Sequence, residues 1–283
     1  MTITDPISLT ARLTAAARAR ESRRADRLFD DPLAEALAGP EGVAFMERLE
    51  EASRPPGTTV SGQNPYIAIR TRFFDDFLPA ALAASGARQV VLVAAGLDSR
   101  AYRLDWPPGT RLFELDRPEV LRAKQEVVDR AGVHPRCDRR TAGVDLLADW
   151  AGALTASGFE GAAPSIWLIE GLFPYLAEAA AIGVLEQSAR LAAPGSRLGA
   201  DVVGRAFLDS PFTRVYLEAL ERANAPWKFG TDQPEAFFGA RGWLATAVRP
   251  GDEPASYGRW LFPVMPRGTP GLPQTFIVTA TRA

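Results

Sequence analysis

The segment Arg88–Lys124 reads RQVVLVAAGLDSRAYRLDWPPGTRLFELDRPEVLRAK and decides the fold. Its first part, Val90–Ala95, is apolar at every position and then breaks at Gly96. A continuous apolar run is typical of a strand that is buried on both faces of a parallel sheet. A second short strand, Leu112–Leu115, ends at Asp116. The segment therefore predicts an α/β fold in which helices cover a parallel sheet.

The turn after the first strand contains the residues that we expect to bind a cofactor. Gly96 allows a tight turn and leaves no side chain between the backbone and a ligand. Asp98 and Arg100 follow, in the crevice at the carboxyl end of the strand where open α/β sheets bind ligands. Asp116, at the tip of the second strand, is placed to bind ribose hydroxyls. The alternative is that Asp98 and Asp116 only cap the helices that follow them.

The glycine pattern indicates which kind of cofactor to expect. The motif G-x-G-x-x-G is absent, because Asp98 stands at the position of the second glycine. A dinucleotide needs close contact between its pyrophosphate and the backbone, and a carboxylate here would repel phosphate. A cofactor with a ribose but no phosphate fits better. We therefore expect S-adenosylmethionine, with a nicotinamide-dependent oxidoreductase as the remote alternative.

One arginine on an apolar helix face joins the candidate site. In the predicted helix PYIAIRTRFFDDFL, Arg70 shares its face with four apolar side chains, Ile67, Phe73, Phe74 and Phe77. An unpaired cation would be costly there, so Arg70 needs an anion, and its planar guanidinium suits a carboxylate. That carboxylate belongs either to the methionine end of the cofactor or to a protein acid. Arg72 is expected at the surface, beside Asp75 and Asp76.

Two further predicted strands also end in an acid. The strand near Arg139–Val144 is followed by Asp145, and the strand Ser165–Ile169 by Glu170. Asp145 can accept a hydrogen bond from an adenine amino group while the backbone of Leu146 donates to the ring, or it can cap the next helix, near 147–154. Carboxyl ends of parallel strands meet at one edge, so four strand tips should converge there: Gly96, Asp116, Asp145 and Glu170. A negative rim suits a sulfonium better than a polyphosphate.

The rest of the chain reads as one domain over residues 1–283. A helical segment, 1–87, precedes a cofactor-binding core at 88–204. An aromatic-rich insertion, 205–241, is suited to cap an apolar acceptor, and 242–283 supplies the last two strands. We expect seven strands in total, mostly parallel, in a Rossmann-like sheet.

The N-terminal segment carries a run of arginines, Arg18, Arg20, Arg23, Arg24 and Arg27. The run is either a solvated helix face or a lid over an anionic ligand. Ser8 or Thr10 is expected to cap the first helix, and 53–65 is expected to be a Pro/Gly/Ser loop.

Composition excludes several classes of function. Lys and Arg total 32 against 34 acids, a net charge of −2, which gives no case for nucleic acid or an anionic membrane as partner. The single cysteine, Cys137, excludes an internal disulfide and suits a reducing cytoplasm.

The single histidine, His134, stands with Cys137 before the third strand, opposite the expected ligand crevice, so neither metal binding nor a His-based mechanism is expected. No apolar run is long enough for a membrane span. Nothing in the sequence indicates an oligomeric state.

Several sequence motifs of the chain resemble those of the leucine carboxyl methyltransferase family. The resemblance is to its bacterial branch of S-adenosylmethionine-dependent O-methyltransferases in particular, which includes tetracenomycin-type polyketide carboxyl methyltransferases. The resemblance covers nearly the whole chain. It rests on LVAAGLDSRAYRL with FELDRPEVLRAK, on RARESRRADRLFDDPLA, on IEGLFPYL and on GTDQPEAFF. It implies a class I methyltransferase fold, a cofactor-carboxylate role for Arg70, an adenine role for Asp145 and Leu146, and a place for Glu170 beside the methionine end of the cofactor.

The expected activity is methyl transfer to a hydrophobic small molecule of secondary metabolism. A carboxylate acceptor is already ionised at neutral pH and needs no base, whereas a phenol or alcohol needs one. Glu170, Asp98 and Tyr175 are the available candidates near the acceptor. Carboxyl O-methylation is therefore favoured over hydroxyl O-methylation. A homologue that binds the cofactor without turnover is the further alternative.

Overall fold

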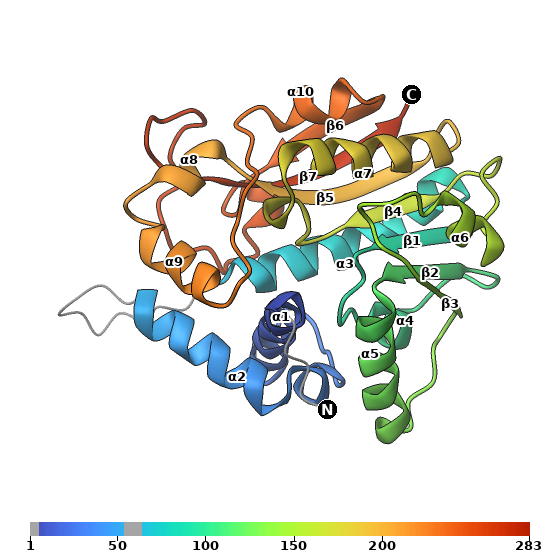
Figure 1. Ribbon diagram of the computed structural model, residues 1–283, viewed down its shortest axis with the longest axis horizontal. Helices are drawn as coiled ribbons and strands as arrows, with labels where there is room; N and C mark the ends of the chain where they lie inside the picture. The colour runs from blue at the N-terminus through green and yellow to red at the C-terminus, as the bar shows by residue number, and fades with distance from the viewer. Residues whose placement is uncertain (1–5, 54–63) are drawn as a thin grey trace.

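The structure, a computed structural model, describes residues 6–53 and 64–283. Its centre is a seven-stranded sheet in the order β3-β2-β1-β4-β5-β7-β6, in which only β7 runs antiparallel to its neighbours (Figure 1). The strands are β1 (Gln89–Val93), β2 (Arg111–Asp116), β3 (Asp138–Gly143), β4 (Ile166–Ile169), β5 (Arg197–Val203), β6 (Trp243–Val248) and β7 (Thr275–Arg282). The predicted α/β fold with a mostly parallel seven-stranded sheet is confirmed.

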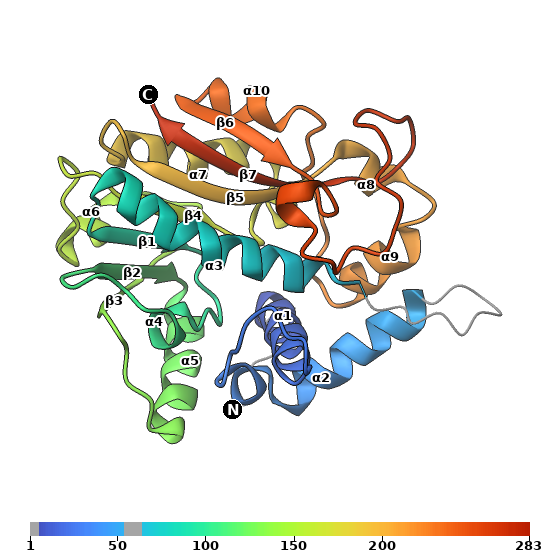
Figure 2. The same ribbon diagram turned by 180° about the vertical axis from the view of Figure 1, so that it is seen from behind.

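Helices cover both faces of this sheet and its carboxyl edge. They are α1 (Pro6–Ser22), α2 (Ala34–Ser53), α3 (Tyr66–Ser85), α4 (Arg100–Arg103), α5 (Pro118–Ala131), α6 (Ala151–Ala156), α7 (Glu178–Leu191), α8 (Arg205–Asp209), α9 (Arg214–Arg222) and α10 (Pro234–Gly239), with 3₁₀ turns η1 (Phe173–Tyr175) and η2 (Glu253–Ala255). Figures 1 and 2 show α3 on one face and α7 on the other.

Alternate side chains of the central strands build the two sides of the core. Val91 and Val93 of β1 belong to the hydrophobic cluster beneath α7, whereas Val90 and Leu92 belong to the cluster beneath α3. Because successive residues of a strand point to opposite faces, a run without polar residues is the pattern that such a two-sided core requires. Each of these four side chains is at most 2% exposed.

Several local expectations need correction. Helix α1 begins at Pro6, so neither Ser8 nor Thr10 is its N-cap, because proline itself fits the first helical turn. The helix expected near 147–154 begins only at Ala151, where the side chain of Gln187 on α7 accepts hydrogen bonds from the backbone of Trp150 and Ala151. Most of the loop expected over 53–65 lies outside the described residues.

The insertion expected over 205–241 contains the short helices α8, α9 and α10. Leu220 of α9 packs against Phe45 and Leu49 of α2, which joins the insertion to the N-terminal helices. Within residues 6–53 and 64–283, no helix combines the length and the apolar character needed to cross a membrane.

Candidate functional site

The loops after β1 and β2 are joined through Asp116. Gly96 adopts a left-handed conformation with φ of 50°, and its N–H donates to Oδ2 of Asp116 at 2.7 Å. The other carboxylate oxygen accepts from the N–H of Arg117, also at 2.7 Å. Burial raises the pKa of Asp116 although these two hydrogen bonds and the charge of Arg117 oppose the shift. The carboxylate is thus held at the tip of β2, directly against the Gly96 turn.

Arg70 is held between two carboxylates, one directly after β4 and one within β5. Its Nε donates to Oε1 of Glu170 and its Nη1 to Oδ2 of Asp201, each at 2.9 Å. Asp201 also accepts from the hydroxyl of Tyr66 at 2.9 Å and from the N–H of Gly171 at 2.6 Å. The expectation that Arg70 needs a carboxylate is met in this structure by protein acids, the alternative that the sequence left open.

Arg100 forms a second cationic centre beside the first. Its Nη1 donates to Oε2 of Glu170 at 2.8 Å and also to Oδ2 of Asp98, and its Nε donates to Oδ1 of Asp75 at 2.7 Å. Oδ1 of Asp98 accepts from the backbone N–H of Arg100 at 2.7 Å, so Asp98 also has the capping role that was its alternative. Glu170 therefore bridges Arg70 and Arg100, one with each oxygen.

The charges at this edge fix the protonation states of Glu170 and Asp98. Burial opposes ionisation of Glu170, but Arg100 and Arg70 outweigh it and hold the pKa of its carboxyl below the usual value. Burial also opposes ionisation of Asp98, yet Arg100 and Lys124 lower the pKa of that carboxyl to about 2. Burial raises the pKa of Tyr175. At neutral pH both carboxyls are ionised and weakly basic, and the phenol keeps its proton.

Asp145 and Leu146 lie beyond the end of β3. Asp145 is exposed, its Oδ1 accepts from the N–H of Leu147 at 2.9 Å, and its carbonyl accepts from the N–H of Ala148 at 3.0 Å. These bonds form a local turn and not a helix cap, because the next helix, α6, begins only at Ala151, so the second of the two sequence interpretations is wrong. Leu146 packs against the core cluster beneath α7.

Helix α1 covers the Gly96 turn. A Cβ added to Gly96 would lie 3.6 Å from Cβ of Ala11. Arg18 donates through Nε to Asp31 at 2.8 Å and through Nη2 to the carbonyl of Leu97 at 2.7 Å. Because Leu97 follows Gly96, this arginine fastens α1 to the turn. Arg18 is 8% exposed, so it does not belong to a solvated helix face. Arg23 and Arg24 of the same arginine run are exposed.

Sequence reasoning missed two acids of this cluster. Asp201 is the single charged residue inside the apolar stretch LGADVV, and that position was the available signal. Asp75 was expected at the surface beside Arg72, which is wrong: it is 8% exposed and binds Arg100 and Arg103. Arg72 does pair with Asp76, at 2.9 Å. Asp75 points inward because it lies four residues after the buried Thr71, on the same face of α3.

His134 and Cys137 precede β3 at its amino end, the edge opposite Gly96. His134 is exposed, and burial raises the pKa of the Cys137 thiol to about 12. Among the described residues, no three His, Cys, Asp or Glu side chains are grouped so that they could hold a metal ion.

Comparison with known proteins adds an independent line of evidence. Residues 11–189 match the model of the family described as leucine carboxyl methyltransferase. A candidate S-adenosyl-L-methionine-dependent methyltransferase of Parafrankia sp. (strain EAN1pec) is 50% identical over 68% of this chain and 62% of its own length. A second relative with the same description, from Mycobacterium sp. (strain JLS), is 40% identical over 86% of this chain and 85% of its own.

Two solved structures share the fold at low sequence identity. A DUF574 family protein from Streptomyces avermitilis has a TM-score of 0.65 at 14% identity, with 97% of each chain covered. A candidate methyltransferase from Thermobifida fusca has a TM-score of 0.62 at 14% identity, covering 99% of this chain and 96% of that one. The family match spans more than half of the chain, and the chain belongs to the leucine carboxyl methyltransferase family of enzymes.

Proposed function

We propose that this protein transfers a methyl group from S-adenosylmethionine to the carboxylate of a hydrophobic small molecule. The methyltransferase activity and its cofactor follow from the family. The carboxylate acceptor rests on one observation about the three candidate bases near the acceptor: the pKa values of Glu170 and Asp98 are lowered, and Tyr175 keeps its proton at neutral pH. An acceptor that must lose a proton would find no group here suited to take it, whereas a carboxylate is ionised before it binds.

The residues at this edge fit the cofactor. Asp116 holds a carboxylate at the β2 tip, where ribose hydroxyls would bind, and Gly96, which has no side chain, turns the backbone directly beside it. Glu170 and Asp98 are ionised and suit a sulfonium and an ammonium. S-adenosylmethionine, when bound, supplies the methyl group.

Arg70 is the proposed partner of the cofactor's carboxylate, although protein acids hold it here. Two of its nitrogens, Nε and Nη1, donate to Glu170 and Asp201, and no bond from Nη2 to a described residue is present. A guanidinium has five N–H donors, so it can keep both acids and still bind a third carboxylate. Asp145 and Leu146 are the proposed adenine contacts, and Arg100 orients Asp98 and Glu170.

An aromatic cluster beside the site is the proposed acceptor wall. Tyr175 of η1 packs edge-on against Trp227 with ring centroids 6.1 Å apart. Trp227 in turn contacts Phe207 and Tyr216 of the insertion, with centroids 5.1 and 5.4 Å away. We assign 205–241 as the acceptor cap, 1–87 as the lid, 88–204 as the cofactor core and 242–283 as the closing strands. An apolar cap with few polar groups suits a polyketide-like acid of secondary metabolism, handled in the cytoplasm.

The acceptor is tested with labelled S-adenosylmethionine and matched pairs of aromatic compounds that carry either a carboxylate or a phenol. We expect the acid to be methylated at a rate that changes little between neutral and mildly alkaline pH, because its ionisation is already complete. A phenol should react only as the pH approaches the phenol's own pKa. Faster methylation of the phenol than of the acid at neutral pH would reverse the assignment. If the protein bound the cofactor but methylated neither class of compound, it would be a cofactor-binding homologue without turnover.

The cofactor contacts are tested by calorimetry with S-adenosylhomocysteine. Asp116→Asn and Arg70→Gln should each weaken binding by about 1–3 kcal/mol, the cost of a lost charged hydrogen bond. Asp76→Asn, at an exposed helix position paired with Arg72, is the matched control and should leave the affinity unchanged. An unchanged affinity in either site variant would remove that residue from the cofactor contacts.

A further inference from the structure

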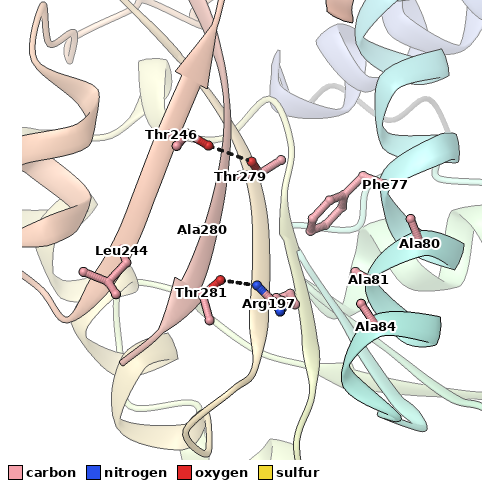
Figure 3. Close-up of a pocket in the computed structure, with 10 residues that line it drawn as sticks. All are labelled: Phe77, Ala80, Ala81, Ala84, Arg197, Leu244, Thr246, Thr279, Ala280 and Thr281. Atoms are coloured by element: carbon pink, nitrogen blue, oxygen red, sulfur yellow. Dashed lines mark hydrogen bonds between the residues drawn. The ribbon is translucent and has the colours of Figure 1, made fainter.

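A groove of about 400 Å³ lies between α3 and the strands β5, β6 and β7. Figure 3 shows Phe77, Ala80 and Ala84 of α3 on one side and the strand residues on the other. Arg197, the first residue of β5, stands in this groove. Because Gly96 follows the carboxyl end of β1, which runs parallel to β5 within the same sheet, the groove lies toward the opposite edge from the cofactor site.

Arg197 lacks an anionic partner. Its Nη1 donates to the hydroxyl of Thr281, and its Nε is buried without an acceptor. In the described parts of the chain, no carboxylate lies within ion-pair distance of it, whereas Arg70 and Arg100 each hold at least two. A half-buried guanidinium with unused donors is a site for a carboxylate, which its planar fork binds well.

The remainder of the groove is mostly apolar and open. Leu244 of β6 is 68% exposed, and the alanines of α3 leave space where larger side chains would fill it. The only neutral polar groups along the strands are threonine hydroxyls, and those of Thr246 and Thr279 are bonded to each other at 3.2 Å. The volume lies within the range of small-molecule sites, roughly 300–1,000 Å³.

We propose that this groove is a second binding site, which takes a small carboxylic acid with an apolar body. The carboxylate pairs with Arg197, and the apolar body lies against Leu244 and the α3 alanines. The charge of Arg197 selects an anion over a neutral ester, and the wall of small side chains selects a flat or slender body. The proposal does not depend on the identity of the methyl acceptor, because the two sites lie toward opposite edges of the sheet.

The test uses 2-naphthoate as the probe and methyl 2-naphthoate as its neutral twin. Binding is measured by calorimetry on the full chain saturated with S-adenosylhomocysteine. We expect the acid to bind the wild type, the ester to bind at least tenfold more weakly, and Arg197→Gln to weaken binding of the acid at least tenfold. Ala84→Trp, which fills the groove from an exposed helix position, should abolish binding.

Arg130→Gln is the control, because Arg130 is an exposed arginine on α5, away from the groove. It should leave binding of the naphthoate unchanged, and all three variants should retain their affinity for S-adenosylhomocysteine, which shows that they fold. Absence of binding to the wild type at millimolar concentration would overturn the proposal. Equal binding in Arg197→Gln and Ala84→Trp would do the same. A dimer that is seen by sedimentation and that dissociates in the Leu244→Asp variant would also overturn the proposal, because the groove would then be an interface between copies of the chain.

Discussion

Gly96 has a backbone conformation that favours a residue without a side chain. Its φ is 50°, in the left-handed region. A Cβ added to Gly96 would lie 3.6 Å from Cβ of Ala11 on α1. Gly96→Ala should cost about 1–2 kcal/mol of stability from backbone strain and should also weaken cofactor binding, because the new methyl group occupies the approach to the turn.

A matched control separates these two effects. Gly86 has φ of 69° at the end of α3, and an added Cβ there would meet nothing within 4 Å. Gly86→Ala should show a similar loss of stability in urea unfolding and an unchanged affinity for S-adenosylhomocysteine. Equal affinities for the two alanine variants would show that the turn of Gly96 does not approach the cofactor.

The charge pairs of Asp98 predict how stability depends on acid. In the folded protein its pKa is lowered from 3.8 to about 2, despite burial, by Arg100 and Lys124. A group whose folded pKa is depressed contributes stability above its unfolded pKa and loses it as the pH falls through the folded value. Urea unfolding of the wild type should therefore weaken between pH 4 and pH 2 more steeply than that of Asp98→Asn. If the free energy of unfolding fell equally steeply with pH in the two proteins, a stabilising role for the ion pairs of Asp98 would be contradicted.

At the residue scale, the sequence could indicate the acids at strand ends but not their partners. Asp116 and Glu170 stand out because each follows an apolar run. Asp201 lies inside such a run, and its contact with Arg70 joins residues that are 131 positions apart. No local pattern predicts such a contact, because it depends on how α3 lies across β4 and β5.

At the scale of elements, the strands were more predictable than the helices. The sequence predicts strands at Arg197–Val203 and Trp243–Val248 and a helix at Pro118–Ala131, and these are the bounds of β5, β6 and α5. A starting proline marks the beginning of the helix, and mostly apolar segments mark the strands. Helix α8 has five residues and α10 has six, too few for a helical period to be visible. The position of α1 over Gly96 depends on tertiary contacts of Arg18, which a charge run alone does not reveal.

The attachment of α1 to the Gly96 turn can be tested through Arg18. Removal of its hydrogen bonds in Arg18→Ala should free the turn, because the carbonyl of Leu97 and the carboxylate of Asp31 lose their shared donor. We expect faster hydrogen exchange of the α1 amides and of the amides near Leu97, measured by mass spectrometry.

Arg20→Ala is the control on the same helix. Arg20 pairs with Glu50 of α2, and among the described residues no hydrogen bond joins its side chain to the turn. Its loss should leave exchange near Leu97 as in the wild type. If both variants loosened the turn equally, the connection would run through the packing of α1 on α2 and not through Arg18.

At the scale of the whole molecule, the proposed cofactor site draws on segments from most of the chain. Arg70 comes from α3, Asp98 and Glu170 from the loops after β1 and β4, and Asp116 and Asp201 from β2 and β5. The parallel strand order brings these segments to one edge, and this could be expected from the sequence because the carboxyl ends of parallel strands coincide. The position of α1 over that edge could not be expected from the sequence.

A site assembled in this way should link cofactor binding to the stability of the entire fold. S-adenosylhomocysteine at a hundredfold excess over its Kd should stabilise the protein by about 2.7 kcal/mol, which for a chain of this length raises the Tm by roughly 4–5 °C. The transition followed by circular dichroism should move as one, because Arg70 on the N-terminal side and Glu170 in the sheet are held together. Asp116→Asn should show a smaller shift at the same ligand concentration, whereas Asp76→Asn should match the wild type. Two separate transitions, of which the ligand moves only one, would show that the helices before β1 unfold independently of the sheet.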